Sequence, residues 1–224
     1  MRPTTNRKKI VPPGVDRFMG YKINSAKSGV YAETMKTIIN QLEACRSHHG
    51  RILVVRFDLH SHGFKLSDNN KVVSLFMKRI VSWVERNYST NKIGRLWVRE
   101  CERAKHQHYH CALMIDGDKI RHPKKLLEVI KERWEMASPS HHMPYVPKPY
   151  HFVDKHSGLN DSVYRLSYFA KCRGKGYRPD QAKDFSASRI TPQKALKSDC
   201  RRFQGTSHTD MDYPPATALK ALIG

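Results

Sequence analysis

The amino-acid sequence predicts an α+β fold, with a ferredoxin-like (RRM-like), mainly antiparallel sheet and helices packed against one face of it. Two observations lead to this prediction. After a first helix, apolar segments follow one another in the order β-α-β-β-α-β-α. Two consecutive strands are separated only by a short charged turn, which is typical of an antiparallel hairpin.

The first half of the chain supplies two helices and a central strand. Apolar residues at helical spacing from Tyr31 onwards predict a helix that ends before Gly50. Residues 51–59 are β-branched and apolar almost throughout, which predicts a strand buried on both faces. A wide apolar stripe then predicts a helix over 72–88, preceded by a polar loop over 60–70.

The second half supplies the hairpin and two more helices. Residues 95–100 and 108–115 predict the strands of the hairpin. A helix over 123–134 begins with a proline, and a short strand is expected near 150–153. The last predicted element is a helix over 161–171, after which the chain is polar, basic and weakly patterned.

These elements predict one domain over residues 29–175, between a basic N-terminal arm (1–28) and a basic C-terminal extension (176–224). The chain has 41 Lys and Arg against 20 Asp and Glu, a formal net charge of +21 on 224 residues. Solubility alone requires a net charge of only about 2 to 8. We therefore expect the protein to bind nucleic acid, whose phosphates Lys and Arg neutralise.

Neither a membrane segment nor a disulfide framework is predicted. No apolar run approaches the roughly 20 residues that span a bilayer, and the N-terminus lacks the hydrophobic region of a signal peptide. The five cysteines are scattered and form no Cys-x-x-Cys pair, so we interpret them as reduced thiols. The expected location is the cytoplasm, with no membrane partner.

Two histidines at the start of a predicted strand are candidate metal ligands. Alternate side chains of a strand share a face, so His108 and His110 can bind one metal ion. Across the hairpin, Glu100 is the expected third ligand, opposite residue 108 or residue 110 according to where the turn is centred. This set leaves coordination positions open for a phosphate oxygen and water.

Other interpretations of the histidines stay open. His108 and His110 can be half-buried residues of an ordinary strand, since a histidine usually needs no metal. His106, nearer the turn, is expected to touch solvent or substrate. The segment His60-Ser-His62 repeats the alternate spacing, but we expect it to lie in the polar loop without a role in the site.

A second group of polar residues lies on the last predicted helix. At about 100° per residue, Tyr164, Tyr168 and Lys171 share one face, while the apolar residues of the segment lie on the opposite side. Two phenols and an ammonium on the polar face indicate an active surface, with Lys171 placed to stabilise a phenolate or the charge on phosphate. The alternative is an aromatic pair that stacks on DNA or faces solvent.

Residues 51–59, Glu100 with His108-Tyr-His110, and Tyr168-x-x-Lys171 together resemble the three ordered motifs of HUH endonucleases. The resemblance is to the inovirus-type replication initiation proteins of filamentous phages and their prophage relatives, and it covers about residues 50 to 175. The spacing of Tyr164, Tyr168 and Lys171 is similar to that of two-tyrosine phage initiators, in which the phenols alternate as nucleophiles.

The resemblance implies an HUH endonuclease fold and a site-specific nicking and rejoining reaction on single-stranded DNA at a replication origin. A divalent ion, Mg²⁺ or Mn²⁺, on His108, His110 and Glu100 would polarise the scissile phosphate. Tyr168 would attack that phosphate to give a 5′-phosphotyrosyl link and a free 3′-OH. The implied function is rolling-circle initiation of a phage or prophage in the cytoplasm of a bacterial host, with a host helicase and DNA polymerase as further partners.

Two other functions fit the same residues. A non-catalytic DNA-binding regulator would keep the basic surface while the histidines merely pack, so it would not bind Mn²⁺ or Mg²⁺ through His108 and His110. A relaxase or transposase would use the same chemistry on a different DNA substrate.

Overall fold

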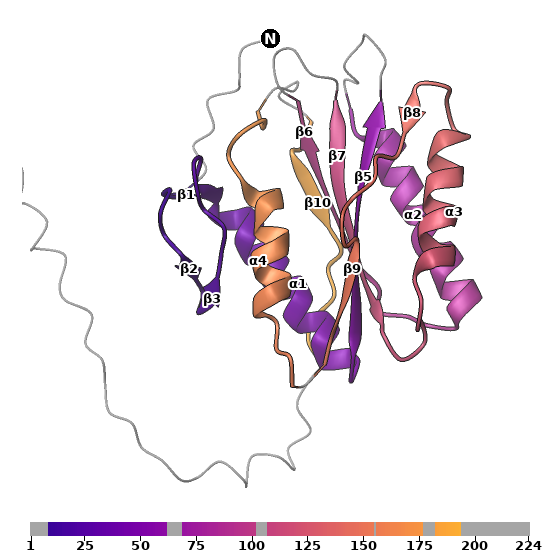
Figure 1. Cartoon of the computed structure of the whole chain (residues 1–224), viewed down its shortest axis with the longest axis horizontal. Coiled ribbons are helices and arrows are strands. Elements are labelled where there is room, and N and C mark those ends of the chain that lie inside the picture. Colours follow the sequence, from indigo (N-terminus) through magenta and orange to yellow (C-terminus); the bar gives the residue numbers. More distant parts are fainter. Residues whose placement is uncertain (1–8, 62–68, 102–106, 155, 177–181, 194–224) are drawn as a thin grey trace, which may run out of the picture. The chain divides into compact units, whose positions relative to one another are not determined.

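A computed structural model describes residues 9–61, 69–101, 107–154, 156–176 and 182–193 of the chain (Figure 1). The helices in these ranges are α1 (Ala32–His48), α2 (Lys71–Tyr88), α3 (Lys124–Glu135) and α4 (Asn160–Ser167), and a 3-10 turn over Tyr168–Ala170 follows α4. The main sheet contains β5 (Ile52–Ser61), β6 (Gly94–Glu100), β7 (His108–Asp116), β8 (His141–His142), β9 (Tyr150–Val153) and β10 (Phe185–Ala187). The predicted α+β class is confirmed.

The main sheet has the strand order β10-β6-β7-β5-β8, and β9 also pairs with β5. All of these pairings are antiparallel. Strands β5, β6, β7 and β9 alternate with α2 and α3 in the β-α-β-β-α-β succession of a ferredoxin-like unit, as predicted. The hairpin of β6 and β7 places Glu100 opposite His108, which is the first of the two predicted registers.

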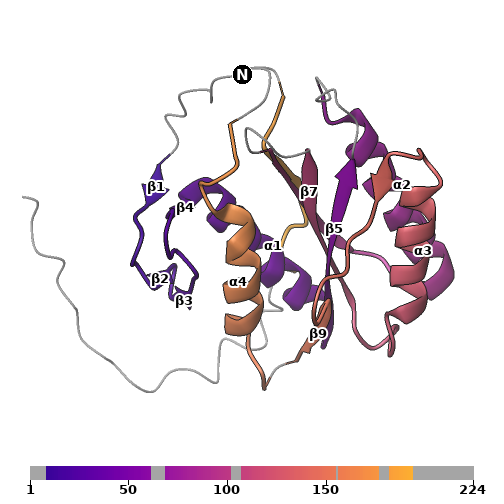
Figure 2. The same cartoon turned by 45° about the horizontal axis from the view of Figure 1, so that its top comes forward.

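The helices lie on both faces of the sheet, and the prediction that they cover one face is wrong (Figure 2). Helices α2 and α3 cover one face, where Leu53, Val55 and Phe57 of β5 enter the core. Helices α1 and α4 cover the other face, over Ile52 and Val54. Because β5 is apolar on both faces, as its sequence predicts, it needs an apolar layer on each side.

Residues 9–31 are packed, unlike the unpacked arm that the sequence predicts. Two small antiparallel pairs form here, β1 (Ile10–Val11) with β4 (Val30–Tyr31) and β2 (Arg17–Phe18) with β3 (Tyr21–Lys22). Ile23 is 3% exposed and belongs to the core that contains residues of α1. The segment has no helical or strand periodicity, which is why its packing is not predicted from sequence. Residues 1–8 lie outside the described residues.

Part of the predicted C-terminal extension is also packed. Strand β10 pairs with β6, and beyond it the side-chain amide of Gln41 on α1 donates to the carbonyl of Ile190 at 3.1 Å. A compact unit therefore extends to Gln193, and residues 194–224 lie outside the described residues. None of the helices in the described ranges is both long and apolar enough to cross a membrane.

Candidate metal centre

The predicted metal ligands converge at the adjoining ends of β6 and β7. Oε2 of Glu100 lies 3.5 Å from Nε2 of His108 and 3.3 Å from Nε2 of His110. One candidate ligand atom from each residue lies within 4.8 Å of those of the other two. Two imidazole nitrogens and a carboxylate oxygen at this spacing could hold a divalent metal ion. His106, predicted to lie nearer the turn, is outside the described residues.

A second carboxylate orients one of these ligands. Asp58 of β5 lies directly opposite His110 of β7, and its Oδ1 is 2.9 Å from Nδ1 of the imidazole. A ring proton held on Nδ1 leaves the lone pair of Nε2 directed toward Glu100, where a metal ion would bind. Sequence reasoning missed Asp58, although a carboxylate inside a mostly apolar strand is a signal that could have identified it.

A buried lysine donates a hydrogen bond to Glu100, the third candidate ligand. Nζ of Lys175 donates to Oε1 of Glu100 at 2.6 Å and to the carbonyl oxygen of Lys171 at 2.6 Å. The Lys175 side chain is 1% exposed, so its charge is paired inside the protein. Lys175 occupies one carboxylate oxygen and leaves the other for the two histidines. The sequence gives no pattern around Lys175 that would identify it.

These charges determine the protonation of the site. Burial alone would raise the pKa of Glu100, but hydrogen bonds from His108 and His110 and the charge of Lys175 outweigh it and hold the pKa well below its usual range. Burial would lower the pKa of His110, but the carboxylates of Asp58 and Glu100 outweigh it and raise the pKa. A divalent ion bound here would replace the imidazolium proton that faces Glu100.

Tyr168 lies beside these ligands. Its ring centre is 5.3 Å from that of His110, and its side chain is 40% exposed. Tyr168 lines a cavity of about 280 Å³ together with Glu100, His108 and Lys171, and the cavity wall also includes Arg173 and residues 26–28. Burial, followed by the negative charge of Glu100, raises the pKa of Tyr168. Cations that offset the charge of Glu100 therefore favour ionisation of this phenol.

One such cation is Arg56 of β5, which sequence reasoning also missed. Its guanidinium carbon lies 5.1 Å from the centre of the Tyr168 ring, and Nη2 is 3.5 Å from Oδ2 of Asp58. Its Nε is buried and has no hydrogen-bond partner within the part of the chain that the structure describes. Arg56 thus places a positive charge next to the phenol, and this charge opposes the increase in the pKa of Tyr168.

Lys171 lines the cavity, but it does so from an extended segment and not from the predicted helix. Helix α4 ends at Ser167, and Lys171 follows the 3-10 turn in an extended conformation, bridged to Val30. Its Nζ donates to Oδ1 of Asn24 at 3.0 Å and to the carbonyl of Ala26 at 2.7 Å. The predicted helix over 161–171 is therefore too long, because the chain leaves the helix to join β4.

Tyr164 is not brought to this cavity. The Nζ of Lys22 lies 5.7 Å from the centre of its ring. Tyr164 lines a separate depression with His151 and Arg165. Of the two predicted tyrosines, the structure places only Tyr168 beside the candidate metal ligands.

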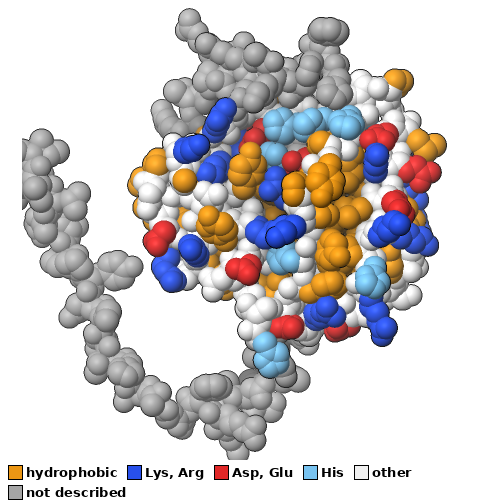
Figure 3. Space-filling model, in the orientation of Figure 1, with side chains coloured by type: hydrophobic (Ala, Val, Ile, Leu, Met, Phe, Trp, Pro, Cys, Tyr) orange, Lys and Arg blue, Asp and Glu red, His pale blue; other side chains and the backbone are white. Residues whose placement is uncertain are grey.

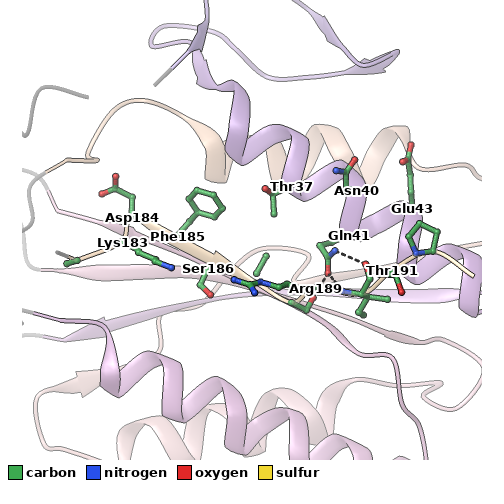
Figure 4. Close-up of a pocket in the computed structure, with 15 residues that line it drawn as sticks. Thr37, Asn40, Gln41, Glu43, Lys183, Asp184, Phe185, Ser186, Arg189 and Thr191 are labelled. Atoms are coloured by element: carbon green, nitrogen blue, oxygen red, sulfur yellow. Dashed lines mark hydrogen bonds between the residues drawn. The ribbon is translucent and has the colours of Figure 1, made fainter. Parts of the chain in front are cut away.

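A larger cavity lies elsewhere in the protein. It measures about 1090 Å³ and lies between α1 and residues 182–192 (Figure 4). Gln41 points from α1 toward the segment that carries Arg189 and Thr191, and hydrogen bonds link the two walls. None of the six residues predicted from sequence to form the site lines this cavity.

Comparison with known proteins gives one match. The family model described as the YagK/YfjJ C-terminal domain matches residues 15–188, which is more than half of the chain. This family is found in prophage-like proteins, and its description states no function. Searches of curated proteins and of solved structures found no significant match. The family match does not test the resemblance to HUH endonucleases.

Proposed function

Because the chain belongs to the YagK/YfjJ C-terminal domain family and carries this candidate metal centre, we propose that it is a metal-dependent DNA endonuclease. The proposed substrate is single-stranded DNA at the replication origin of a phage or prophage. The proposed product is a nicked strand whose 5′-phosphate is joined to Tyr168. The occurrence of the family in prophage-like proteins and the net charge of +21 support this proposal.

The observation that carries the proposal is the cavity that the phenol shares with the metal ligands. Tyr168, Glu100 and His108 line this cavity of about 280 Å³, so a phosphate bound in it would lie beside the phenol and two of the three candidate ligands. The adjacent Phe169, at 0% exposure, is part of the core. Tyr168 is 40% exposed instead, as a nucleophile must be to reach its substrate.

The proposed reaction is a transesterification at phosphorus. A divalent ion on Glu100, His108 and His110 would act as a Lewis acid on the scissile phosphodiester. The Tyr168 oxygen loses its proton and bonds to phosphorus, the bond from phosphorus to the 3′ oxygen breaks, and that oxygen takes up a proton. Arg56, beside the phenol, stabilises the phenolate that attacks phosphorus.

This chemistry suits rolling-circle replication. The phosphotyrosyl link retains the energy of the phosphodiester bond that it replaces, so attack by a 3′-OH rejoins the strand. Meanwhile a DNA polymerase, assisted by a host helicase, extends the free 3′ end. A relaxase or transposase would use the same residues on a different DNA, so the replication assignment rests on the prophage-like context of the family and on the resemblance to phage initiators.

An adduct assay tests this proposal. The full chain is incubated with Mn²⁺ and labelled single-stranded DNA from candidate origins, then denatured and separated by electrophoresis. We expect a denaturation-resistant adduct that EDTA and Tyr168→Phe each abolish. The matched variant Tyr164→Phe keeps the adduct, because Tyr164 lines a different depression.

Two results would contradict the proposal. An undiminished adduct in the Tyr168→Phe variant would exclude Tyr168 as the nucleophile. DNA binding without any adduct, and without Mn²⁺ binding by calorimetry, would favour the non-catalytic regulator instead.

A further inference from the structure

Four polar residues form one row across four adjacent strands. Glu100 of β6 lies opposite His108 of β7, His108 lies opposite His60 of β5, and His60 lies opposite His142 of β8. Directly opposed residues of antiparallel strands point to the same face, so the row lies on one face of the sheet. Figure 3 shows histidine side chains gathered side by side at this end of the sheet.

The imidazole rings of the three histidines in this row lie next to one another, as the strand register predicts. The ring centres of His60 and His108 are 5.1 Å apart, and those of His60 and His142 are 6.4 Å apart. Glu100 and His108 belong to the candidate metal centre, but His60 and His142 do not. The sequence-based expectation that His60 lies in a loop is wrong, since β5 extends to Ser61.

A packing role does not account for His60 and His142. The adjacent His141 packs on Trp134, with ring centres 4.0 Å apart and planes 5° from parallel. The His142 side chain is 51% exposed, and His60 is half-buried. Imidazoles that reach the surface in line with the candidate metal centre are better suited to contact a ligand than to stabilise the core.

We propose that His60 and His142 bind the nucleotides next to the scissile phosphate in a single-stranded nucleic acid. The cavity that contains Tyr168 includes the first two residues of the row, and the row continues out of that cavity across β5 and β8. A strand whose phosphate enters the cavity would therefore lie along His60 and His142. This inference rests on the proposed function, because that function places the phosphate in the cavity.

The local charges decide which part of the nucleotide these rings contact. The Glu135 carboxylate lies 3.7 Å from Nδ1 of His142 and would repel a phosphate there. An imidazole ring can instead stack on a base, a contact that proteins use for single strands and that tolerates any base. We therefore assign His60 and His142 to bases of the bound strand.

Binding measurements with the full chain test this assignment. Fluorescence anisotropy is measured with labelled oligothymidylate in EDTA, at about 200 mM salt to weaken contacts with the basic tails. We expect His60→Ala and His142→Ala each to weaken binding at least about fivefold, as the loss of one stacked base does. His60→Phe and His142→Phe retain a flat ring, so they should bind nearly as tightly as the unmodified chain.

The controls separate this inference from its alternatives. His122→Ala, at an exposed histidine outside the row, should leave binding unchanged. Equal binding of DNA by the alanine variants and the unmodified chain would overturn the inference. Calorimetry with Mn²⁺ tests the alternative that the row is a metal site. If the unmodified chain binds a second equivalent of Mn²⁺ and the alanine variants do not, the inference is also overturned. If the variants bind weakly and the unmodified chain forms no adduct, the stacking contact stands and the nickase proposal fails.

Discussion

His110 is a candidate metal ligand whose two ring nitrogens face different carboxylates. Nδ1 lies 2.9 Å from Asp58, and Nε2 lies 3.3 Å from Glu100. A neutral imidazole carries one ring proton, and on Nδ1 that proton would face the Asp58 carboxylate. We therefore expect the metal affinity of the candidate site to depend on a carboxylate that is not one of its three candidate ligands.

We expect Asp58→Asn to lower the affinity for Mn²⁺ by roughly 10- to 100-fold, the usual effect of removing a partner that orients a metal ligand. Titration calorimetry of the full chain measures this affinity. Asp118→Asn, at an exposed aspartate, is the matched control and should leave the affinity unchanged. An Asp58→Asn variant that binds Mn²⁺ as tightly as the unmodified chain would show that Asp58 does not orient His110.

The sequence predicts Glu100, His108 and His110 because strand periodicity and one hairpin are enough to bring them together. Asp58 and Lys175 require contacts that periodicity does not contain. Asp58 meets His110 only because β5 pairs with β7, and Lys175 meets Glu100 only because the chain folds back after α4. These pairings depend on the packing of the whole sheet.

The segment after α4 connects that helix to the candidate metal centre. The amide of Cys101 donates to the carbonyl of Gly174 at 2.8 Å, and Lys175 binds Glu100 at the end of β6. Gly174 has a φ of +74°, and a Cβ at this position would lie 3.5 Å from Oε2 of Glu100. That distance is an ordinary van der Waals contact, so it is the positive φ that favours glycine at this position.

We expect Lys175→Met to lower the free energy of unfolding by about 2 to 4 kcal/mol, because it leaves the Glu100 charge buried with less compensation. The double variant with Glu100→Gln should lose less than the sum of the single losses, because Lys175 and Glu100 contact each other. Urea unfolding in EDTA measures these values without a contribution from bound metal. The exposed Lys183→Met is the control, and additive losses would contradict a direct coupling.

At the scale of the whole molecule, the β-α-β-β-α-β succession and most element positions follow from hydrophobic periodicity. The placement of helices on both faces of the sheet does not follow from this periodicity, although the sequence already indicates that residues 51–59 are buried on both sides. A strand buried on both faces requires a second helical layer, and α1 and α4 provide it. The packed residues 9–31 remain unpredicted because short two-residue strands carry no periodicity.

The formal charge of +21 makes a further prediction about the intact chain. If Lys and Arg neutralise at least about five phosphates, a plot of log affinity for single-stranded DNA against log salt should have a slope steeper than about −3. Fluorescence anisotropy over a range of salt concentrations measures this slope. A slope shallower than about −1 would contradict an interface based on phosphate contacts.

The identity of the residue that becomes joined to DNA tests the central proposal most directly. Trypsin cleaves after Arg165 and Lys171, so Tyr168 falls in the peptide 166–171 and Tyr164 in a preceding one. Tandem mass spectrometry of the nuclease-trimmed, Mn²⁺-dependent adduct should locate a 5′-phosphonucleotide on Tyr168. A nucleotide on any other residue, or free DNA ends with no protein attached, would contradict the proposed mechanism.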